Sequence, residues 1–224
     1  MSTLSPTQAP VSEPSEAPRP RPMHRLGAGR RILTVLSVLL ALVGGAVAES
    51  GTAFAQTPSG SCTHTCNNPP GGVTQANWNE ALEAADFWAN HTIDFNAVNW
   101  SGGRSYYHLD NVAGRGWPGQ NTGNQWFGYW EPYLHHTEFV YYGGRYNDYN
   151  GLLAYHEQNT LGVSSSQAFS TGNGRTAPYV EYDMDYYSAA RSSRNARRIV
   201  RNPNTGNTYV TYDHYQSFYY LGRY

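Results

Sequence analysis

The chain contains the run Pro178-Tyr179-Val180-Glu181-Tyr182-Asp183-Met184-Asp185-Tyr186-Tyr187. Successive side chains of a strand point to opposite faces of a sheet. Val180, Tyr182, Met184 and Tyr186 would therefore share one face, and the acidic residues would share the other with Tyr179 and Tyr187. The run predicts a strand whose acidic face lies opposite an apolar core.

Further strands are predicted on both sides of this run. Arg198–Arg201 and Asn207–Tyr212 form a predicted pair, because the Asn, Pro and Gly residues of 202–206 favour a turn between them. Tyr215–Leu221 is the last predicted strand, and Glu138–Tyr142 is an earlier one. The last third of the chain is therefore expected to be an antiparallel meander.

A helix is predicted ahead of the strands. Asn77 can cap its start with Glu80 three residues on, as in a capping box, and Asn90 lies near its end. Its apolar positions fall close to helical spacing: Trp78, Ala81, Leu82, Ala85, Trp88 and Ala89. A helix followed by an antiparallel meander predicts an α+β fold, with the N-terminal helix packed on a twisted antiparallel β-sheet. Residues 96–136 show too little periodicity to predict elements, and 158–176 are expected to be a Ser/Gly loop.

The composition limits the classes of protein. The 224 residues allow one domain or two small ones, at roughly 100–200 residues per domain. The 15 basic residues, all Arg, nearly balance 16 acidic ones, and Tyr and Gly are abundant. This composition excludes a disordered, coiled-coil or collagen-like chain. It also excludes a protein that is basic overall, although not a local basic patch.

The first 55 residues have the pattern of a secretory signal peptide. Arg25, Arg30 and Arg31 precede the uncharged run 32–48, and Ala53-Phe54-Ala55 matches a cleavage site before Gln56. An uncleaved membrane anchor is the alternative, since the apolar run is at the lower limit for spanning a bilayer. The prediction is a secreted, extracellular protein without membrane attachment after cleavage. Residues 56–73 are then a linker and 74–224 a single domain.

The two cysteines, Cys62 and Cys66, lie in the predicted linker. In an oxidising compartment such a pair indicates a disulfide, although so small a ring gains little from loop closure. A metal site that includes His64 is the alternative, but two Cys and one His are too few ligands.

Three groups in the last third can carry chemistry: Glu181, His214, and the arginines Arg191, Arg194, Arg197, Arg198 and Arg201. Metal-free phosphodiester transfer needs a carboxylate base, guanidiniums on the phosphoryl oxygens and an imidazolium acid. Taken singly, each group is more often a solvated or structural side chain.

Three motifs stand in order: Tyr179–Asp183, then Arg194 with Arg198-Ile199-Val200, then Tyr212-Asp213-His214-Tyr215-Gln216-Ser217-Phe218. On these motifs residues 177–224 resemble the small extracellular guanyl-preferring ribonucleases of bacteria, barnase and its relatives. The predicted helix resembles the family's N-terminal helix in kind only. The resemblance implies a microbial ribonuclease-like fold in residues 74–224, with long loop insertions in 92–176.

The resemblance also implies roles and products. Glu181 would be the general base on the ribose 2′-OH, and His214 the general acid on the 5′-oxygen. Arg194 and Arg198 would hold the phosphate, Tyr215 would pack against the substrate, and Arg197 is a further candidate for substrate binding. Single-stranded RNA would give 2′,3′-cyclic phosphates without any cofactor or metal, and DNA would not be cleaved because it lacks the 2′-OH.

Base recognition departs from the family pattern. The nearest candidate is the run 144–151, which resembles the base-binding loop of fungal guanyl ribonucleases, with Asn147 and Tyr149 as binding residues. Asn150 stands where that loop has its acid, so the guanine preference is open, and an ordinary Asn/Gly turn is the alternative. Glu157, in a Tyr-His-Glu run, is a rival base, but Glu181 has the better spacing to Arg194.

Two other classes of function stay open. The Trp and Tyr residues of 96–150 could form a carbohydrate or cell-wall binding surface, although core filling is the more common role of Trp. A metal protein could use His135, His136 and Glu138, although adjacent His residues on a strand point to opposite faces. A secreted, monomeric ribonuclease would also need protection inside its producer. We therefore expect a small acidic inhibitor as partner of the arginine cluster.

Overall fold

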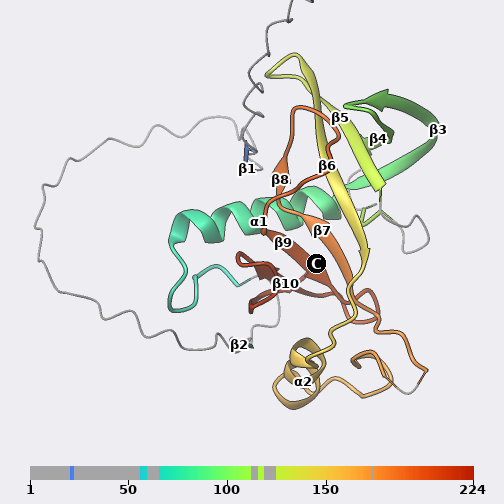
Figure 1. The fold of residues 1–224 in the computed structure, drawn as a ribbon. Coiled ribbons are helices and arrows are strands. Elements are labelled where there is room, and N and C mark those ends of the chain that lie inside the picture. The colour runs from blue at the N-terminus through green and yellow to red at the C-terminus, as the bar shows by residue number, and fades with distance from the viewer. Residues whose placement is uncertain (1–20, 23–55, 60–65, 112–115, 119–124, 173) are drawn as a thin grey trace, which may run out of the picture.

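A computed structural model describes residues 21–22, 56–59, 66–111, 116–118, 125–172 and 174–224 (Figure 1). Its helices are α1 (Gln75–Ala89) and α2 (Leu152–Asn159). Its strands are β1 (Arg21–Pro22), β2 (Gln56–Ser59), β3 (His91–Ser101), β4 (Arg104–Asn111), β5 (Gln125–Glu131), β6 (His136–Arg145), β7 (Val180–Asp183), β8 (Asp185–Tyr186), β9 (Arg198–Arg201), β10 (Asn207–Thr211) and β11 (Ser217–Arg223). The fold is α+β, as predicted.

One open sheet has the strand order β2-β11-β10-β9-β7-β6-β5-β4-β3. Most neighbours run antiparallel, and the pairs β2–β11 and β4–β5 are parallel. β1 pairs separately with β8. The predicted meander is confirmed in β9, β10 and β11 with the turn at 202–206, and the strand predicted at 138–142 is β6.

The expectation of long loop insertions in residues 92–176 is wrong for much of that stretch. Strands β3, β4, β5 and β6 come from it and extend the sheet beyond β7. Gly102 and Gly103 both have positive φ and join β3 to β4 in a two-residue hairpin turn, which suits glycine. Val98 and Trp100 of β3 are exposed, so this edge lacks the apolar alternation by which a half-buried strand is recognised.

The alternating run is a strand only in part. β7 ends at Asp183, Met184 interrupts the pairing, and β8 follows. Val180, Tyr182, Met184 and Tyr186 lie together in the core, so the predicted apolar face is confirmed, and the acidic residues of the opposite face, Glu181, Asp183 and Asp185, are buried as well. The arginines that contact these acids come from β9 and from the loop before it.

Helix α1 packs on the sheet, and its end is where the sequence predicts it. Trp78, Ala81, Ala84, Ala85 and Trp88 are buried in a core with sheet residues such as Val140, Tyr182 and Ile199. The cap, however, is Thr74, whose hydroxyl accepts a hydrogen bond from the backbone N–H of Asn77 at 3.2 Å. Asn77 is therefore not the cap, because it already lies inside the first turn.

Helix α2 covers the opposite face of the sheet, since Leu153 packs with Val200, Tyr209 and Tyr220, which alternate with the residues that face α1. In Figure 1 α2 lies well away from α1, below the sheet. Residues 160–172 and 174–176, in the predicted Ser/Gly loop, hold no helix or strand apart from an isolated bridge between Gly172 and Arg175.

The structure describes only a few of the residues to which the N-terminal predictions apply. The signal-peptide prediction falls outside the described residues except for β1, and part of the expected linker instead forms β2 at the sheet edge. Cys66 is disulfide-bonded, while Cys62 lies outside the described residues. In the described part of the chain no helix has the length and apolar character to cross a bilayer.

Asp148 stabilises the start of α2 and makes that stability depend on pH. It is fully buried, and its carboxylate accepts hydrogen bonds from the N–H groups of Leu153 at 3.2 Å and Ala154 at 3.0 Å. Burial raises the pKa of Asp148 to about 6, although the backbone N–H groups oppose the shift. Because this pKa exceeds the usual 3.8, the contribution to stability is complete below pH 3.8 and is lost as pH rises through 6.

We therefore expect Asp148→Asn to remove one pH-dependent contribution to the free energy of unfolding. Urea unfolding in steps between about pH 4 and 7 should show the stability difference, native protein minus variant, falling as pH rises. A difference that stays constant over this range would contradict the role of Asp148.

Candidate active site

A buried ion cluster on β7 and β9 forms the base of the site. Asp183 is fully buried, and its Oδ1 lies 2.6 Å from Arg194 Nη1 and 3.2 Å from Arg198 Nε. Register pairs Asp183 with Arg198 on adjacent strands. Burial raises the pKa of Asp183, while Arg198 and Arg194 favour its charged form. Removing either sign of charge would leave the other buried without compensation.

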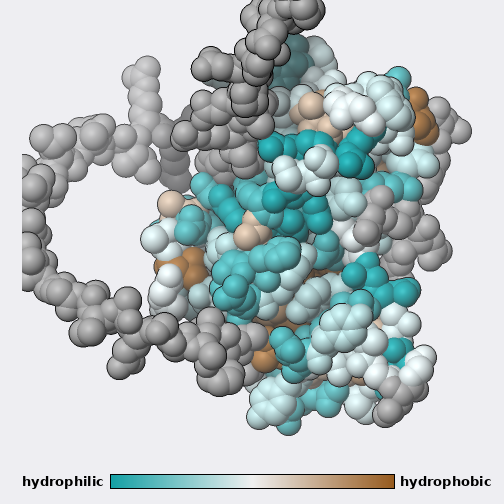
Figure 2. Space-filling model, viewed as in Figure 1, coloured by the Kyte–Doolittle hydropathy of each residue, from teal (hydrophilic) through white to brown (hydrophobic). Residues whose placement is uncertain are grey.

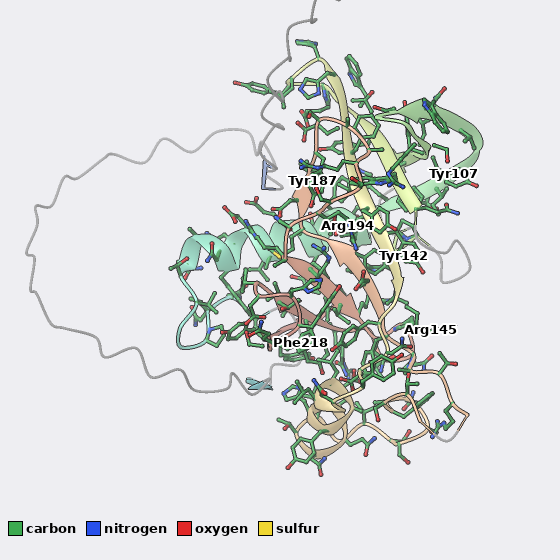
Figure 3. The ribbon with its side chains drawn as sticks, viewed as in Figure 1. Tyr107, Tyr142, Arg145, Tyr187, Arg194 and Phe218 are labelled. Carbon is green, nitrogen blue, oxygen red and sulfur yellow. The ribbon has the colours of Figure 1, made fainter. Side chains whose placement is uncertain are left out.

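Arg194 joins this cluster to Glu181. Its Nη2 lies 3.5 Å from Glu181 Oε1, and its guanidinium lies 4.0 Å from the ring centroid of Tyr141. Burial alone would lower the pKa of Arg194, but Asp183 and Glu181 outweigh that effect and raise it. Figure 3 places Arg194 over the middle of the sheet, near Tyr142 of β6. The Arg194 side chain is still partly exposed, so it can contact a ligand.

The Glu181 carboxylate is held from two further directions. Tyr215 donates its hydroxyl hydrogen to Oε2, and burial together with Glu181 raises the pKa of that hydroxyl, which keeps it a donor. Gly143 of β6 lies against the Glu181 side chain, where an added Cβ would overlap the carboxylate. A glycine at 143 is therefore required by this close approach.

His214 is presented by a tight turn between β10 and β11. His214 and Tyr215 both have positive φ, at 58° and 72°. Asp213 holds the turn, since its Oδ1 accepts hydrogen bonds from Thr211 Oγ1 and from the N–H groups of Gln216 and Ser217. Burial would raise the pKa of Asp213, but these hydrogen bonds and that of the Ser217 hydroxyl lower it. His214 is exposed, and its ring lies 4.7 Å from that of Tyr215.

The arginine cluster is not the open basic patch that its sequence suggests. Arg198 is 2% exposed and lies behind Asp183, and it donates to the Arg197 carbonyl at 2.7 Å. Arg197 pairs with Glu80 of α1 and, at 3.5 Å, with Asp185. Arg201 donates to the Tyr224 carbonyl at 2.9 Å. The acids that neutralise Arg194, Arg197 and Arg198 come from β7, β8 and α1, so a count of charges along residues 188–212 could not reveal them.

The candidate base-binding residues lie on the loop after β6. Tyr149 is 76% exposed, and its hydroxyl accepts a hydrogen bond from Asn147 Nδ2 at 3.1 Å. Asp148 faces inward onto α2, so its carboxylate is not presented to a ligand. The loop starts close to Glu181, because the ring of Tyr146 stacks on Tyr215 with centroids 5.0 Å apart.

The rival base Glu157 has a structural environment. It is fully buried on α2, and its carboxylate accepts hydrogen bonds from Asn202, Thr205 and Asn207 of the β9–β10 turn. None of these partners belongs to the group around Asp183. The structure therefore places Glu181, and not Glu157, beside Arg194.

The alternative metal ligands do not assemble into a site. His136 Nε2 lies 3.9 Å from Glu138 Oε1, while His135 occupies the preceding turn with φ of 54°. Across the described ranges no group of three or more His, Cys, Asp or Glu side chains is arranged to hold a metal.

Three residues that contact Glu181 or Arg194 were given no role from the sequence: Asp183, Tyr141 and Gly143. Asp183 lies two residues from Glu181 on the same strand, so its position on the same face was readable from the alternation. Tyr141 and Gly143 are brought in by the pairing of β6 with β7, in which Gly144 lies opposite Glu181. The sequence alone gives no sign of that register.

Comparison with known proteins identifies no relative: no protein-family model, curated protein or solved structure matches the chain. The chemical reading of the site therefore depends on its geometry and on the sequence motifs. The partly exposed guanidinium of Arg194 lies beside the Glu181 carboxylate. The exposed imidazole of His214 contacts the ring of Tyr215, whose hydroxyl is bonded to Glu181. Figure 2 shows hydrophilic residues over the middle of this face of the molecule. Such an arrangement can bind an anion and move protons on either side of it.

Loss of the Asp183 charge tests the ion cluster. Asp183→Asn should lower the free energy of unfolding by about 3–5 kcal/mol, because it leaves the buried Arg198 without its counter-ion and Arg194 with Glu181 alone. Denaturant titration measures the change, with Asp86→Asn on the partly exposed part of α1 as control. A loss below about 1 kcal/mol would show that the cluster does not stabilise the fold.

Gly143→Ala tests the positioning of Glu181 without removing a polar group. The new Cβ must displace the Glu181 carboxylate, and we expect any activity that depends on Glu181 to fall by about 100-fold, as misplacement of a reacting group typically does. Gly71→Ala is the control, because a Cβ there meets open space. Unchanged activity in a folded Gly143→Ala protein would remove Glu181 from the mechanism.

Proposed function

We propose that this protein is a secreted, metal-independent endoribonuclease that cleaves single-stranded RNA by transphosphorylation. The observation that carries the proposal is the contact between Glu181 and the partly exposed Arg194, with the exposed His214 beyond Tyr215. The motifs that resemble the bacterial extracellular ribonucleases supply these residues in the same order. The microbial ribonuclease-like form of the α+β fold belongs to the same proposal.

The first chemical step transfers two protons and exchanges two bonds to phosphorus. Glu181 takes the proton of the ribose 2′-OH while the 2′-oxygen attacks the phosphorus. The bond to the 5′-oxygen breaks, and protonated His214 gives that oxygen its proton. The products are a 2′,3′-cyclic phosphate and a free 5′-hydroxyl end. Water then opens the cyclic ester to a 3′-phosphate, with the two residues in reversed roles.

Arg194 is the guanidinium that contacts the phosphate in this proposal. It is partly exposed and already oriented by Asp183 and Glu181, so little reorganisation accompanies the charge that develops in the transition state. Arg198 is too deeply buried for the same role and acts as a positioning residue through Asp183. Arg197 is held by Glu80 and Asp185, and we assign it to joining α1 to the sheet.

Base binding at the loop after β6 is a finer part of the proposal. Tyr149 is exposed for stacking on a base, and Tyr146 connects the loop to Tyr215 and Glu181. Asn150 supplies no carboxylate for the guanine edge, and Asp148 is occupied at α2. We therefore propose stacking by Tyr149 with a relaxed preference for guanine.

A carbohydrate or cell-wall binding role is the second candidate. Trp100 and Trp130 are 71% and 58% exposed, whereas Trp126 is buried, so core filling accounts for only part of the aromatic set. Binding of this kind would not depend on His214.

Partners and location follow from the proposed chemistry. A secreted enzyme of this kind acts as a monomer on RNA outside the cell, and its producer would need a small acidic inhibitor. Acids of the protein itself neutralise most of the arginine cluster. Such an inhibitor would therefore contact Arg194 and the exposed Arg145 instead of the whole cluster.

Cleavage of GpU, ApU, CpU and UpU with EDTA present tests the proposal. The protein should release 2′,3′-cyclic nucleotides, and Glu181→Gln and His214→Ala should each lower kcat by about 10²–10⁴-fold. Glu157→Gln is the matched control and should keep its activity per folded molecule. No cleavage by the native protein, or full activity in folded Glu181→Gln, would reject the proposed mechanism.

A further inference from the structure

A pocket of about 460 Å³ lies in the part of the sheet that extends beyond β7. This volume is in the range of small-molecule sites, roughly 300–1,000 Å³. It is lined by residues of β3, β4, β5 and β6 and of the turn between β3 and β4, among them Trp100, Arg104, Tyr107, Trp126 and Tyr141. Neither the catalytic motifs nor the resemblance accounts for it.

Two contacts place this pocket next to the proposed active site. Tyr141 lines the pocket, and its ring is also the one over which the Arg194 guanidinium lies at 4.0 Å. The β3–β4 turn packs on the segment that leads into the arginine loop, where a Cβ on Gly102 would overlap the Ala190 carbonyl oxygen. In Figure 3 Tyr107 lies toward the β3–β4 edge of the sheet, on the far side of Tyr142 from Arg145.

The lining has the chemistry of a surface that binds a nucleobase. Trp100 is 71% exposed, and the lining residues include further aromatic ones, of which Tyr107 packs against Phe127 and Tyr141 against Trp126. Aromatic side chains stack on the bases of single-stranded nucleic acids regardless of sequence. Arg104 is exposed, and none of the described residues that line the pocket is acidic, which suits contact with a phosphate. Burial raises the pKa of the Tyr141 hydroxyl, and the positive charges of Arg194 and Arg104 partly offset this shift.

We propose that this pocket is a second base-binding subsite, which takes a nucleotide of single-stranded RNA that flanks the cleaved phosphodiester. This proposal rests on the proposed ribonuclease function. Trp100 stacks on the base, and Arg104 contacts a phosphate one or more nucleotides from the one on Arg194. A dinucleotide does not extend beyond the cleaved bond far enough to fill the subsite, so the pocket makes the enzyme prefer longer RNA.

The test compares chain lengths in single variants of the full protein. We measure kcat/KM on GpU and on an RNA hexanucleotide with one GpU step for the native protein, Trp100→Ala and Arg104→Ala. Trp130→Ala and Arg223→Ala are the matched controls, since both side chains are exposed and lie outside the pocket. We expect Trp100→Ala to lower kcat/KM about 10-fold on the hexanucleotide and less than 2-fold on GpU, from the loss of one stacked base.

A binding measurement keeps the subsite testable apart from catalysis. A fluorescent 2′-deoxy hexanucleotide cannot be cleaved, because it lacks the 2′-OH. Its Kd should rise about 10-fold in Trp100→Ala, and the salt dependence of log Kd should become shallower by about 0.7 in Arg104→Ala, the value for one phosphate contact with a single strand.

The outcomes separate the subsite from the reaction. Equal losses on GpU and the hexanucleotide, or unchanged deoxyhexanucleotide binding in Trp100→Ala, would overturn the subsite while leaving the ribonuclease intact. Failure of the native protein to cleave any RNA would reject the proposed function, and the binding measurement would still decide the subsite. Loss of soluble chitohexaose binding in Trp100→Ala, with deoxyhexanucleotide binding retained, would assign the pocket to a carbohydrate instead.

Discussion

Asp183 is buried between two guanidiniums, and the elements of the site converge on that one carboxylate. Arg194 reaches it from the loop between β8 and β9, and Arg198 reaches it from β9. Helix α1 is tied to the same residue, since the Trp88 indole N–H donates to the Asp183 carbonyl at 2.8 Å. Removing a carboxylate and two guanidiniums from water is costly, and only close contact in fixed geometry offsets that cost. The burial of this group therefore fixes how β7, β9, α1 and the arginine loop fit together.

This constraint also explains why the site is ordered where a substrate would bind. Arg194 contacts Asp183 through Nη1 and Glu181 through Nη2, and its side chain stays partly exposed. Glu181 is confined by Tyr215 and by the absence of a side chain at Gly143. The His214 backbone N–H donates to the Ala196 carbonyl at 3.1 Å and its ring contacts Tyr215, while the residue stays exposed. A fixed carboxylate and guanidinium, together with one accessible imidazole, are suited to proton transfer around a bound phosphate.

The two halves of the sheet have different parts in this proposal. The half from β7 to β11 carries the carboxylate, the arginines and the imidazole, and its pattern was visible as alternation, turn residues and motif order. The half from β3 to β6 supplies Gly143 and Tyr141 to the site and adds an aromatic pocket beside it. Strand β6 was predicted, whereas β3, β4 and β5 were not, because they combine exposed Trp, Gly and polar residues at an edge of the sheet where no single face is apolar.

The sequence by itself determined the helix that ends next to Asn90, the β9–β10–β11 meander with its turn, the α+β class, and the choice of Glu181, Arg194 and His214 as candidates. These depend on local periodicity, turn chemistry and motif order, which are properties of neighbouring residues. Only the tertiary structure decided which charges are neutralised, because Glu80, Asp183 and Asp185 reach the arginines from other elements. It likewise showed that Glu181 lies beside Arg194, whereas Glu157 is buried against the β9–β10 turn. Burial and strand register bring together residues that are far apart in the chain. The physical reason is that hydrogen bonding and desolvation act through space, whereas a pattern in the sequence reports only on its own segment.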